Sequence, residues 1–375
     1  MRILHVIPSV SRTYGGPTQS LLGFLLAARA AGIEVEVAAP DPGPDERDWW
    51  AKSLPGQHLT LFPSLGAGAF VSSPPLLWWL LRHGERFDLV HIHALQNPIS
   101  STAAAACRIR GWPYLIRPLG MLSEFTFTHR RQLAKKLYFR AFDRGNIAAS
   151  SGIHFTTEGE RQEGLRRVHY LGVRAFVVPP PWSGEPTARA PAARPELLFL
   201  SRLHPVKNLE ALLRAWPQVL RVVPNASLVL AGDGDPGYVS SLHALVRDLG
   251  ITGSTRFTGF ATGDQKHALL ASARAFALIS FHENFGVAAL EAIAAGLPLV
   301  LSPTVHIAPL VSAHRLGTAI DPSDSNALAA AVVTALTDIA LQGHCATAGP
   351  ALVQSAFSVE TIAAQLLTMY QQACA

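Results

Sequence analysis

The chain has 375 residues, 49% of them apolar and only 15% charged, with 31 Lys and Arg against 26 Asp and Glu. This composition excludes extended disorder, and so small and dispersed a basic surplus does not indicate a protein that binds nucleic acid. The length exceeds what one hydrophobic core usually supports, so we expect two domains. Cys107, Cys345 and Cys374 are far apart in the sequence, which predicts neither a disulfide framework nor a thiolate metal site.

The N-terminal residues 3–7 predict a buried strand. Pro8 cuts this apolar run too short for a signal peptide, and no segment reaches the ~18 uninterrupted apolar residues of a membrane span. We therefore expect a cytoplasmic protein that contacts the inner face of the plasma membrane peripherally at most.

Gly15 and Gly16 follow this strand and precede a helix expected over 18–31. Paired glycines let the backbone approach a ligand closely, and the start of a helix favours an anion. An ordinary turn is the alternative, because two glycines alone carry little information.

Short apolar runs alternate with Ala- and Leu-rich stretches through the first half, which is typical of a parallel sheet covered by helices. Further strands are expected over 34–38, 89–93, 114–117 and 152–156. His91 and His93 fall on one face of their strand, because side chains alternate along a strand. Two histidines at this spacing could bind a metal, but no third ligand has a suitable spacing in the sequence, so zinc is not expected.

A basic segment follows Arg117, which ends the strand over 114–117. Its cations could hold an acceptor phosphate or, with the apolar run around Trp78 and Trp79, could contact an anionic membrane surface. A solvated helix face and tryptophans in the core are the alternatives. The cations of the segment are Arg130, Arg131, Lys135, Lys136 and Arg140.

Residues 179–182 read Pro-Pro-Pro-Trp, and residues 183–195 are rich in Pro, Ala and Arg without periodicity. This segment is the best candidate for a linker between domains. The second half repeats the alternation, and a last helix is expected over 358–370 from its apolar spacing. The strands expected in this half cover 196–201, 227–231, 275–279 and 298–302.

Arg202 ends the strand over 196–201, and Lys207 follows at the start of the next helix. Two cations at the rim of a sheet could neutralise a diphosphate. Two solvated surface cations are the alternative.

The segment from Gly232 to Gly237 satisfies the pattern G-x-G-x-x-G after a strand, which alone is a weak signal for a dinucleotide site. Asp233 and Asp235 would repel a pyrophosphate, and the expected acidic partner, Asp248, falls in a predicted helix. The segment is therefore a poor nicotinamide site.

Glu283 and Glu291 flank the opening of a helix that ends at Gly296, with seven residues between the two carboxylates. Backbone N–H groups of Phe285, Gly286 and Val287 would point at an anion there. Each glutamate alone would be explained as a dipole complement or a surface residue. Glu291 lies in an apolar run, however, where a carboxylate needs a ligand or an internal partner.

The segment 282–298 resembles the donor-site signature of family four glycosyltransferases. The resemblance implies an α/β GT-B fold, in which two Rossmann-like domains face each other across a cleft. It places an acceptor-side domain at 1–180 and a nucleotide-sugar donor domain at 190–357, with the helix of 358–375 packed back on the first domain. The family commonly carries Pro-Asn-Gly where this chain has the prolines of 179–182, which puts any ligand contact of that turn in question.

The resemblance also implies a role for each site residue. Glu283 and His93 would contact the donor sugar, while Arg202 and Lys207 would stabilise the leaving diphosphate. Glu291 would bind the ribose. The remaining donor-site positions are Gly15, Gly16, Gly232, Gly259, Phe260, Asn284, Phe285, Gly286 and Val287, and the acceptor-side positions are Arg117, Arg130 and Arg131.

We therefore expect a retaining hexosyltransferase that moves a sugar from a nucleotide diphosphate donor to a glycan or lipid-linked acceptor in surface polysaccharide synthesis. No metal or other cofactor is expected, since Arg202 and Lys207 would take the role of a metal. A nucleotide-sugar epimerase or phosphorylase of the same fold, and a non-catalytic scaffold of a polysaccharide assembly complex, are the alternatives.

Overall fold

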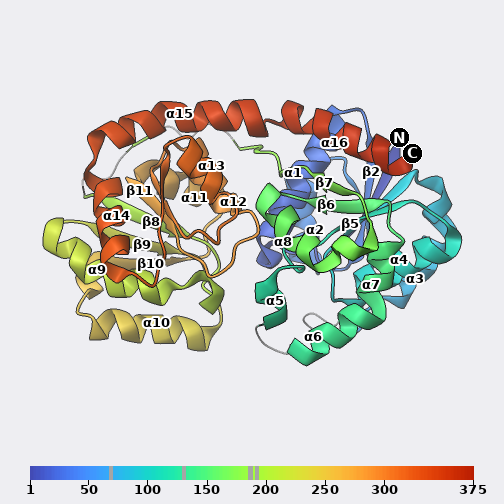
Figure 1. Ribbon diagram of the computed structural model, residues 1–375, viewed down its shortest axis with the longest axis horizontal. Helices are drawn as coiled ribbons and strands as arrows, with labels where there is room; N and C mark the ends of the chain where they lie inside the picture. The colour runs from blue at the N-terminus through green and yellow to red at the C-terminus, as the bar shows by residue number, and fades with distance from the viewer. Residues whose placement is uncertain (67–70, 129–131, 185–188, 191–193) are drawn as a thin grey trace. The chain divides into compact units, whose positions relative to one another are not determined.

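The computed structural model describes residues 1–66, 71–128, 132–184, 189–190 and 194–375. They divide into two compact units, one formed by Met1–Ser183 with Phe357–Ala375 and the other by Gly184–Ala356. Each unit is built on one parallel sheet with helices packed against it (Figure 1). The α/β class and the two Rossmann-like units predicted from the sequence are confirmed.

The sheet of the first unit has the strand order β3-β2-β1-β4-β5-β6-β7. All its pairings are parallel, so the carboxyl ends of the strands share one edge. The order reverses between β1 and β4, which is where open α/β sheets bind their ligands. The strands are β1 Arg2–Val6, β2 Glu34–Pro40, β3 His58–Phe62, β4 Leu89–His93, β5 Tyr114–Arg117, β6 Gly152–Phe155 and β7 Ala175–Val177.

The C-terminal helix α16, Val359–Cys374, packs on α1, Gly16–Ala30, within this unit (Figure 1). Ile362, Leu366 and Tyr370 recur every four residues and are fully buried, so the predicted apolar spacing does form one face of a helix. The other α-helices are α2 Pro44–Ser53, α3 Pro74–His83, α4 Pro98–Arg110, α5 Glu124–Thr128, α6 Gln132–Tyr138, α7 Arg144–Ala148 and α8 Glu158–Val168.

The sheet of the second unit has the order β10-β9-β8-β11-β12-β13, again parallel, and reverses between β8 and β11. Its strands are β8 Glu196–Leu200, β9 Ser227–Ala231, β10 Thr255–Gly259, β11 Ala275–Leu278, β12 Leu299–Leu301 and β13 Gly317–Ala319. The helices are α9 Leu209–Val222, α10 Pro236–Asp248, α11 Gly263–Ser272, α12 Val287–Ala294, α13 Ala308–Ala313, α14 Ser325–Thr337 and α15 Ile339–Phe357.

In the described part of the chain, no single helix is both long and apolar enough to cross a membrane. One bent combination, α14 with the stretch Ile339–Cys374, reaches the required length and composition only when its members are taken together. Cys107, Cys345 and Cys374 are all free thiols.

Candidate functional site

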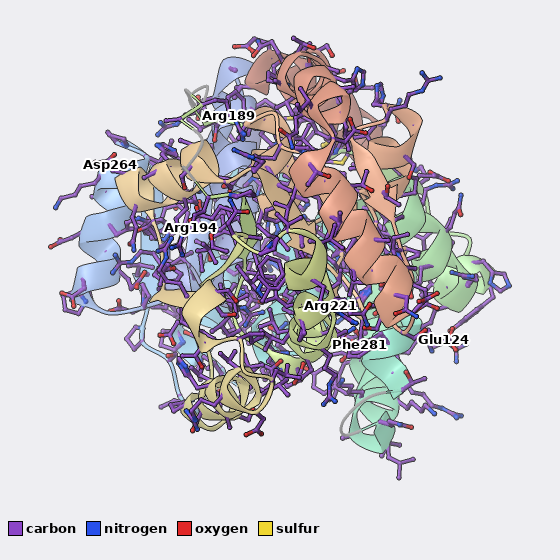
Figure 2. All side chains as sticks on the ribbon, turned by 90° about the vertical axis from the view of Figure 1, so that its left-hand side faces the viewer. Glu124, Arg189, Arg194, Arg221, Asp264 and Phe281 are labelled. Carbon is purple, nitrogen blue, oxygen red and sulfur yellow. The ribbon has the colours of Figure 1, made fainter. Side chains whose placement is uncertain are left out.

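The predicted donor residues lie at the carboxyl edge of the second sheet. Arg202 comes just after β8, Gly232 follows β9, and Glu283 lies in the loop after β11. Phe281 in the same loop is 51% exposed (Figure 2). Because these strands are parallel and adjacent, residues separated by up to about eighty positions in sequence meet at one edge.

An ion pair between Lys207 and Glu283 joins two of these loops. Lys207 Nζ donates a hydrogen bond to Glu283 Oε2, and the two side chains are only 10% and 19% exposed. The backbone reinforces the contact, since Phe281 N–H donates to the carbonyl oxygen of Val206 at 2.8 Å. Lys207 and Glu283, for which the resemblance implied separate roles toward the diphosphate and the sugar, are therefore direct partners.

Gly286 shapes the turn between Glu283 and α12. Its φ of 88° lies in the left-handed region, which glycine adopts without the steric cost that a side chain brings. Helix α12 therefore begins at Val287, immediately after the loop that carries Glu283, and its first N–H groups lie at the edge of the sheet where Glu283 is found.

Glu291 has an internal partner that the sequence did not reveal. Lys266 Nζ on α11 donates to Glu291 Oε1 at 2.6 Å, and both side chains are mostly buried. This pair explains how a carboxylate is tolerated in the apolar run of α12. A carboxylate can accept about four hydrogen bonds, so Glu291 retains capacity for the two hydroxyls of a ribose.

The glycines of the G-x-G motif serve close backbone packing. A Cβ atom on Gly232 would stand 1.8 Å from Ser201 O, and one on Gly234 would stand 1.9 Å from Leu203 O. Leu203 N–H donates to Asp233 O at 2.8 Å, which locks the loop after β9 against the loop that carries Arg202. Asp248 ends α10, as expected from the sequence, so the acidic partner of a dinucleotide site is missing from its place at a strand end.

The predicted base pocket lies in an exposed part of this region. Gly259 ends β10 with a φ of 72°, and Phe260 exposes 49% of its side chain. Gly232 N–H donates to Gly259 O at 2.8 Å, which places the two loops side by side. Arg202 is exposed as well, so its charge faces solvent at the same edge of the sheet.

In the first unit, Arg117 is buried instead of lying on an open acceptor surface. It ends β5 opposite His93 of β4, and its Nη2 donates to Ser20 Oγ of α1 at 2.9 Å. Burial lowers the pKa of Arg117 to about 10. Gly15 and Gly16 lie at the start of the same helix, as predicted. Arg130 and Arg131 lie outside the described residues.

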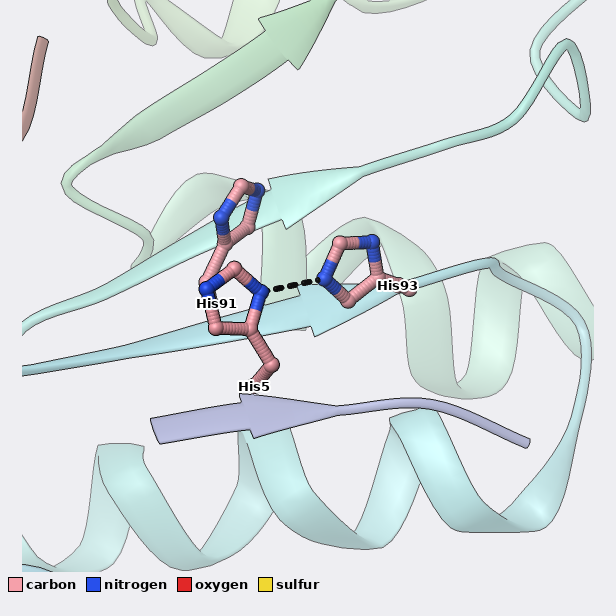
Figure 3. Close-up of side chains that lie close together, drawn as sticks. All are labelled: His5, His91 and His93. Carbon is pink, nitrogen blue, oxygen red and sulfur yellow. Dashed lines mark hydrogen bonds between the residues drawn. The ribbon is translucent and has the colours of Figure 1, made fainter. Parts of the chain in front are cut away.

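His91 and His93 share one face of β4, with ring centroids 4.6 Å apart, which confirms the predicted alternation. The spacing of residues along the sequence predicted no third ligand beside His91 and His93, but the fold brings a third histidine there from β1. His5 Nδ1 lies 2.9 Å from His93 Nε2 (Figure 3). His5 pairs in register with His91, a relation between strands that spacing along the sequence does not contain. One ligand atom from each ring lies within 4.8 Å of the others.

Two protein families match this chain and together span most of it. The family described as "Glycosyl transferases group 1" matches residues 186–351, which hold the Lys207–Glu283 and Lys266–Glu291 pairs. The family described as "Glycosyl transferase 4-like domain" matches residues 15–182.

Individual relatives point the same way. The chain is 35% identical to glycogen synthase of Mycobacterium tuberculosis over 184 residues, but this region covers 49% of the chain and only 44% of the synthase. It is 26% identical over 341 residues to the GDP-mannose:cellobiosyl-diphosphopolyprenol alpha-mannosyltransferase of Komagataeibacter xylinus, covering 86% of this chain and 81% of that one. The fold is similar to that of Anabaena HepE in complex with UDP and glucose, with a TM-score of 0.79 and 21% identity over 99% of each chain.

Replacing Gly234 by Ala should lower the free energy of unfolding by about 1–3 kcal/mol, because the added methyl group overlaps the Leu203 carbonyl oxygen. Gly253→Ala is the matched control, since a Cβ atom at Gly253 meets nothing within 4 Å. Urea unfolding followed by circular dichroism measures both. Equal stability of the two variants would contradict the close contact between the two loops.

Proposed function

Because the chain belongs to the family four glycosyltransferases, which have the GT-B fold, we propose that it transfers a sugar from a nucleotide diphosphate donor to a hydroxyl of an acceptor. The observation that carries this proposal is the Lys207–Glu283 pair beside the start of α12. A cation and free helical N–H groups suit a diphosphate, and a carboxylate suits the hydroxyls of a sugar. Membership of this family also argues against the epimerase and scaffold alternatives.

The donor is held mainly by the second unit in this proposal. The diphosphate lies at the start of α12, with Lys207 and Arg202 neutralising its charge. Glu291, oriented by Lys266, accepts hydrogen bonds from the ribose, and the base lies near Phe260. The relatives and solved structures whose names include UDP, glucose or GDP-mannose support a nucleotide sugar as the donor.

We further propose retention of configuration at the anomeric carbon. Pairing with Lys207 weakens Glu283 as a nucleophile, because its negative charge is shared with an ammonium group. The bond from the anomeric carbon to the phosphate oxygen then breaks on the face where the bond to the acceptor oxygen forms. The departing phosphate oxygen takes the proton of the acceptor hydroxyl, which balances the reaction without a protein nucleophile.

The acceptor in this proposal is a glycan carried on a lipid, within the synthesis of a surface polysaccharide. The mannosyltransferase of Komagataeibacter xylinus, whose name specifies a diphosphopolyprenol acceptor, supports this choice. A lipid-linked acceptor places the reaction at the cytoplasmic face of a membrane.

Helix α6 of the first unit has the composition of a membrane-contacting surface. Its Leu133 and Leu137 are 77% and 67% exposed, and Lys136 is exposed beside them. The two neighbouring tryptophans have different environments: Trp78 is 59% exposed, whereas Trp79 packs against the core. We infer that α6 contacts the membrane, because exposed leucines favour the acyl boundary and cations favour anionic headgroups.

Glu283→Gln and Lys207→Ala should each lower kcat/KM by at least about 100-fold, because one removes a sugar contact and the other removes charge beside the leaving group. Release of nucleoside diphosphate from a panel of nucleotide sugars, measured in a coupled assay, tests this. Glu360→Gln and Lys52→Ala are the controls, since both residues are exposed and lie in the first unit. Activity near wild type in either site variant would contradict the proposed roles of Glu283 and Lys207 in sugar transfer.

Exhaustive chelation should leave the rate of transfer unchanged, because Arg202 and Lys207 supply the positive charge that a metal would otherwise bring to the diphosphate. The assay is run after dialysis against EDTA and again after magnesium or manganese is added back. A reproducible requirement for either ion would count against the proposed donor site.

The protein should sediment with anionic vesicles at low salt, and the double variant Lys136→Gln/Arg140→Gln should bind them at least about fivefold more weakly, since each cation near the surface contributes on the order of 1 kcal/mol. Arg221→Gln, on α9 of the second unit (Figure 2), is the control. Unchanged binding by the double variant would exclude α6 and the residues directly after it, which include Arg140, as the membrane contact.

A further inference from the structure

Four histidines and one tyrosine form a cluster in the first unit. Each of their side chains is fully buried, and together they come from four separate segments of the chain. Three of the histidines belong to the neighbouring strands β1 and β4 (Figure 3), a fourth comes from β6, and the tyrosine comes from α16. The members are His5, His91, His93, His154 and Tyr370.

The hydrogen bonds of this cluster have one direction, which a backbone carbonyl sets. His154 Nε2 lies 2.7 Å from Val178 O, and because a carbonyl oxygen can only accept, this nitrogen carries the proton. The Nδ1 of a neutral His154 is then an acceptor, so the nitrogen of His91 that faces it at 3.2 Å, Nε2, is the donor. His91 Nδ1 in turn accepts from the hydroxyl of Tyr370 at 2.9 Å.

The same logic continues from Tyr370 to the end of β4. The tyrosine oxygen, having donated its hydrogen, accepts from His5 Nε2 at 3.4 Å, the longest contact of the series. His5 Nδ1 is therefore an acceptor, and it receives the hydrogen of His93 Nε2 at 2.9 Å (Figure 3). This leaves His93 Nδ1 with a lone pair.

Every histidine of the cluster is neutral, which the preceding steps require. Burial lowers the pKa of His5 and of His154 to about 3, and the positive charge of Arg117 acts in the same direction. Burial lowers the pKa of His91 and of His93 as well, and repulsion that the neighbouring histidines and Arg117 would exert on an added charge acts in the same direction. Arg117 also opposes a metal cation between His5, His91 and His93.

The lone pair of His93 Nδ1 is buried and accepts no hydrogen bond from any described residue. It points away from His5 at the carboxyl end of β4 (Figure 3). Nε and Nη1 of Arg117, the register partner of His93 on β5, likewise have no acceptor among the described residues. Unpaired buried polar atoms are unfavourable, so a polar ligand that reaches this edge of the sheet would supply the partners that the described residues do not.

We propose that this series of hydrogen bonds fixes His93 as the Nε2–H tautomer, so that its Nδ1 accepts a hydrogen bond from a hydroxyl of the bound sugar substrate. Tyr370 is then a positioning residue: it contacts no substrate, but it links His91 to His5 and so sets the tautomer that the substrate meets. That the substrate is a sugar rests on the proposed sugar transfer. The tautomer of His93 follows from the hydrogen bonds alone and does not depend on that proposal.

The tautomer is tested on the whole protein with ¹⁵N-labelled histidine. Long-range ¹H–¹⁵N spectra distinguish a protonated Nε2 from a protonated Nδ1, and loss of a signal in His93→Gln assigns it. Wild type should show His93 only as the neutral Nε2–H form. In Tyr370→Phe, His5 can move its proton to Nδ1 and donate to His93, so His93 should become a mixture of tautomers.

Kinetics provide the second readout. Tyr370→Phe should lower kcat roughly fivefold with KM for the donor unchanged, because one hydrogen bond to the reacting substrate weakens. Tyr170→Phe makes the same chemical change on an exposed ring and should alter neither kcat nor the His93 signal.

The proposal is overturned if His93 in wild type is charged or protonated at Nδ1, or if Tyr370→Phe leaves its tautomer unchanged. Stoichiometric zinc in the purified protein that is lost in His93→Gln would overturn it too, since a metal would replace the hydrogen bonds. If no nucleotide sugar is turned over but the tautomers are as expected, the proposed transfer fails and the hydrogen-bonded series stands.

Discussion

The ion pair between Lys207 and Glu283 is the interaction on which the candidate donor site depends. It joins the loop after β8 to the loop after β11, the two strands between which the order of the second sheet reverses. Both side chains are largely buried, and removing one partner of such a pair typically costs about 3–5 kcal/mol because a charge is left uncompensated. The pair therefore keeps the two loops together before a ligand binds, and a diphosphate can share Lys207 without moving the backbone.

Buried polar side chains find their hydrogen-bond and charge partners differently in the two units. In the second unit, each carboxylate of the site has a lysine partner, with Lys207 on Glu283 and Lys266 on Glu291. In the first unit, the buried histidines stay neutral and form hydrogen bonds with one another and with Tyr370, while Arg117 provides the charge. Both arrangements lie at the carboxyl ends of parallel strands, where side chains from distant parts of the sequence converge.

The sequence predicted the interior of both sheets and missed their edges. The nine expected strands match β1, β2, β4, β5, β6, β8, β9, β11 and β12 to within one or two residues at each end. The strands that were missed are β3, β7, β10 and β13, which are the edge strands of the two sheets. An interior strand is covered on both faces and reads as an apolar run, whereas these edge strands keep exposed or partly exposed residues that interrupt the pattern. The motif around Glu283 could be found from the sequence because its residues lie close together along the chain. The roles of Lys266, His5 and Tyr370 could not, because each of them contacts a partner from another segment of the chain.

The most direct test of the donor site is a crystal structure of the protein with a bound nucleoside diphosphate. The site described here predicts that the diphosphate lies at the start of α12 within hydrogen-bonding distance of Lys207, and that the ribose hydroxyls meet Glu291. A diphosphate bound elsewhere, with the Lys207–Glu283 pair untouched, would contradict the account.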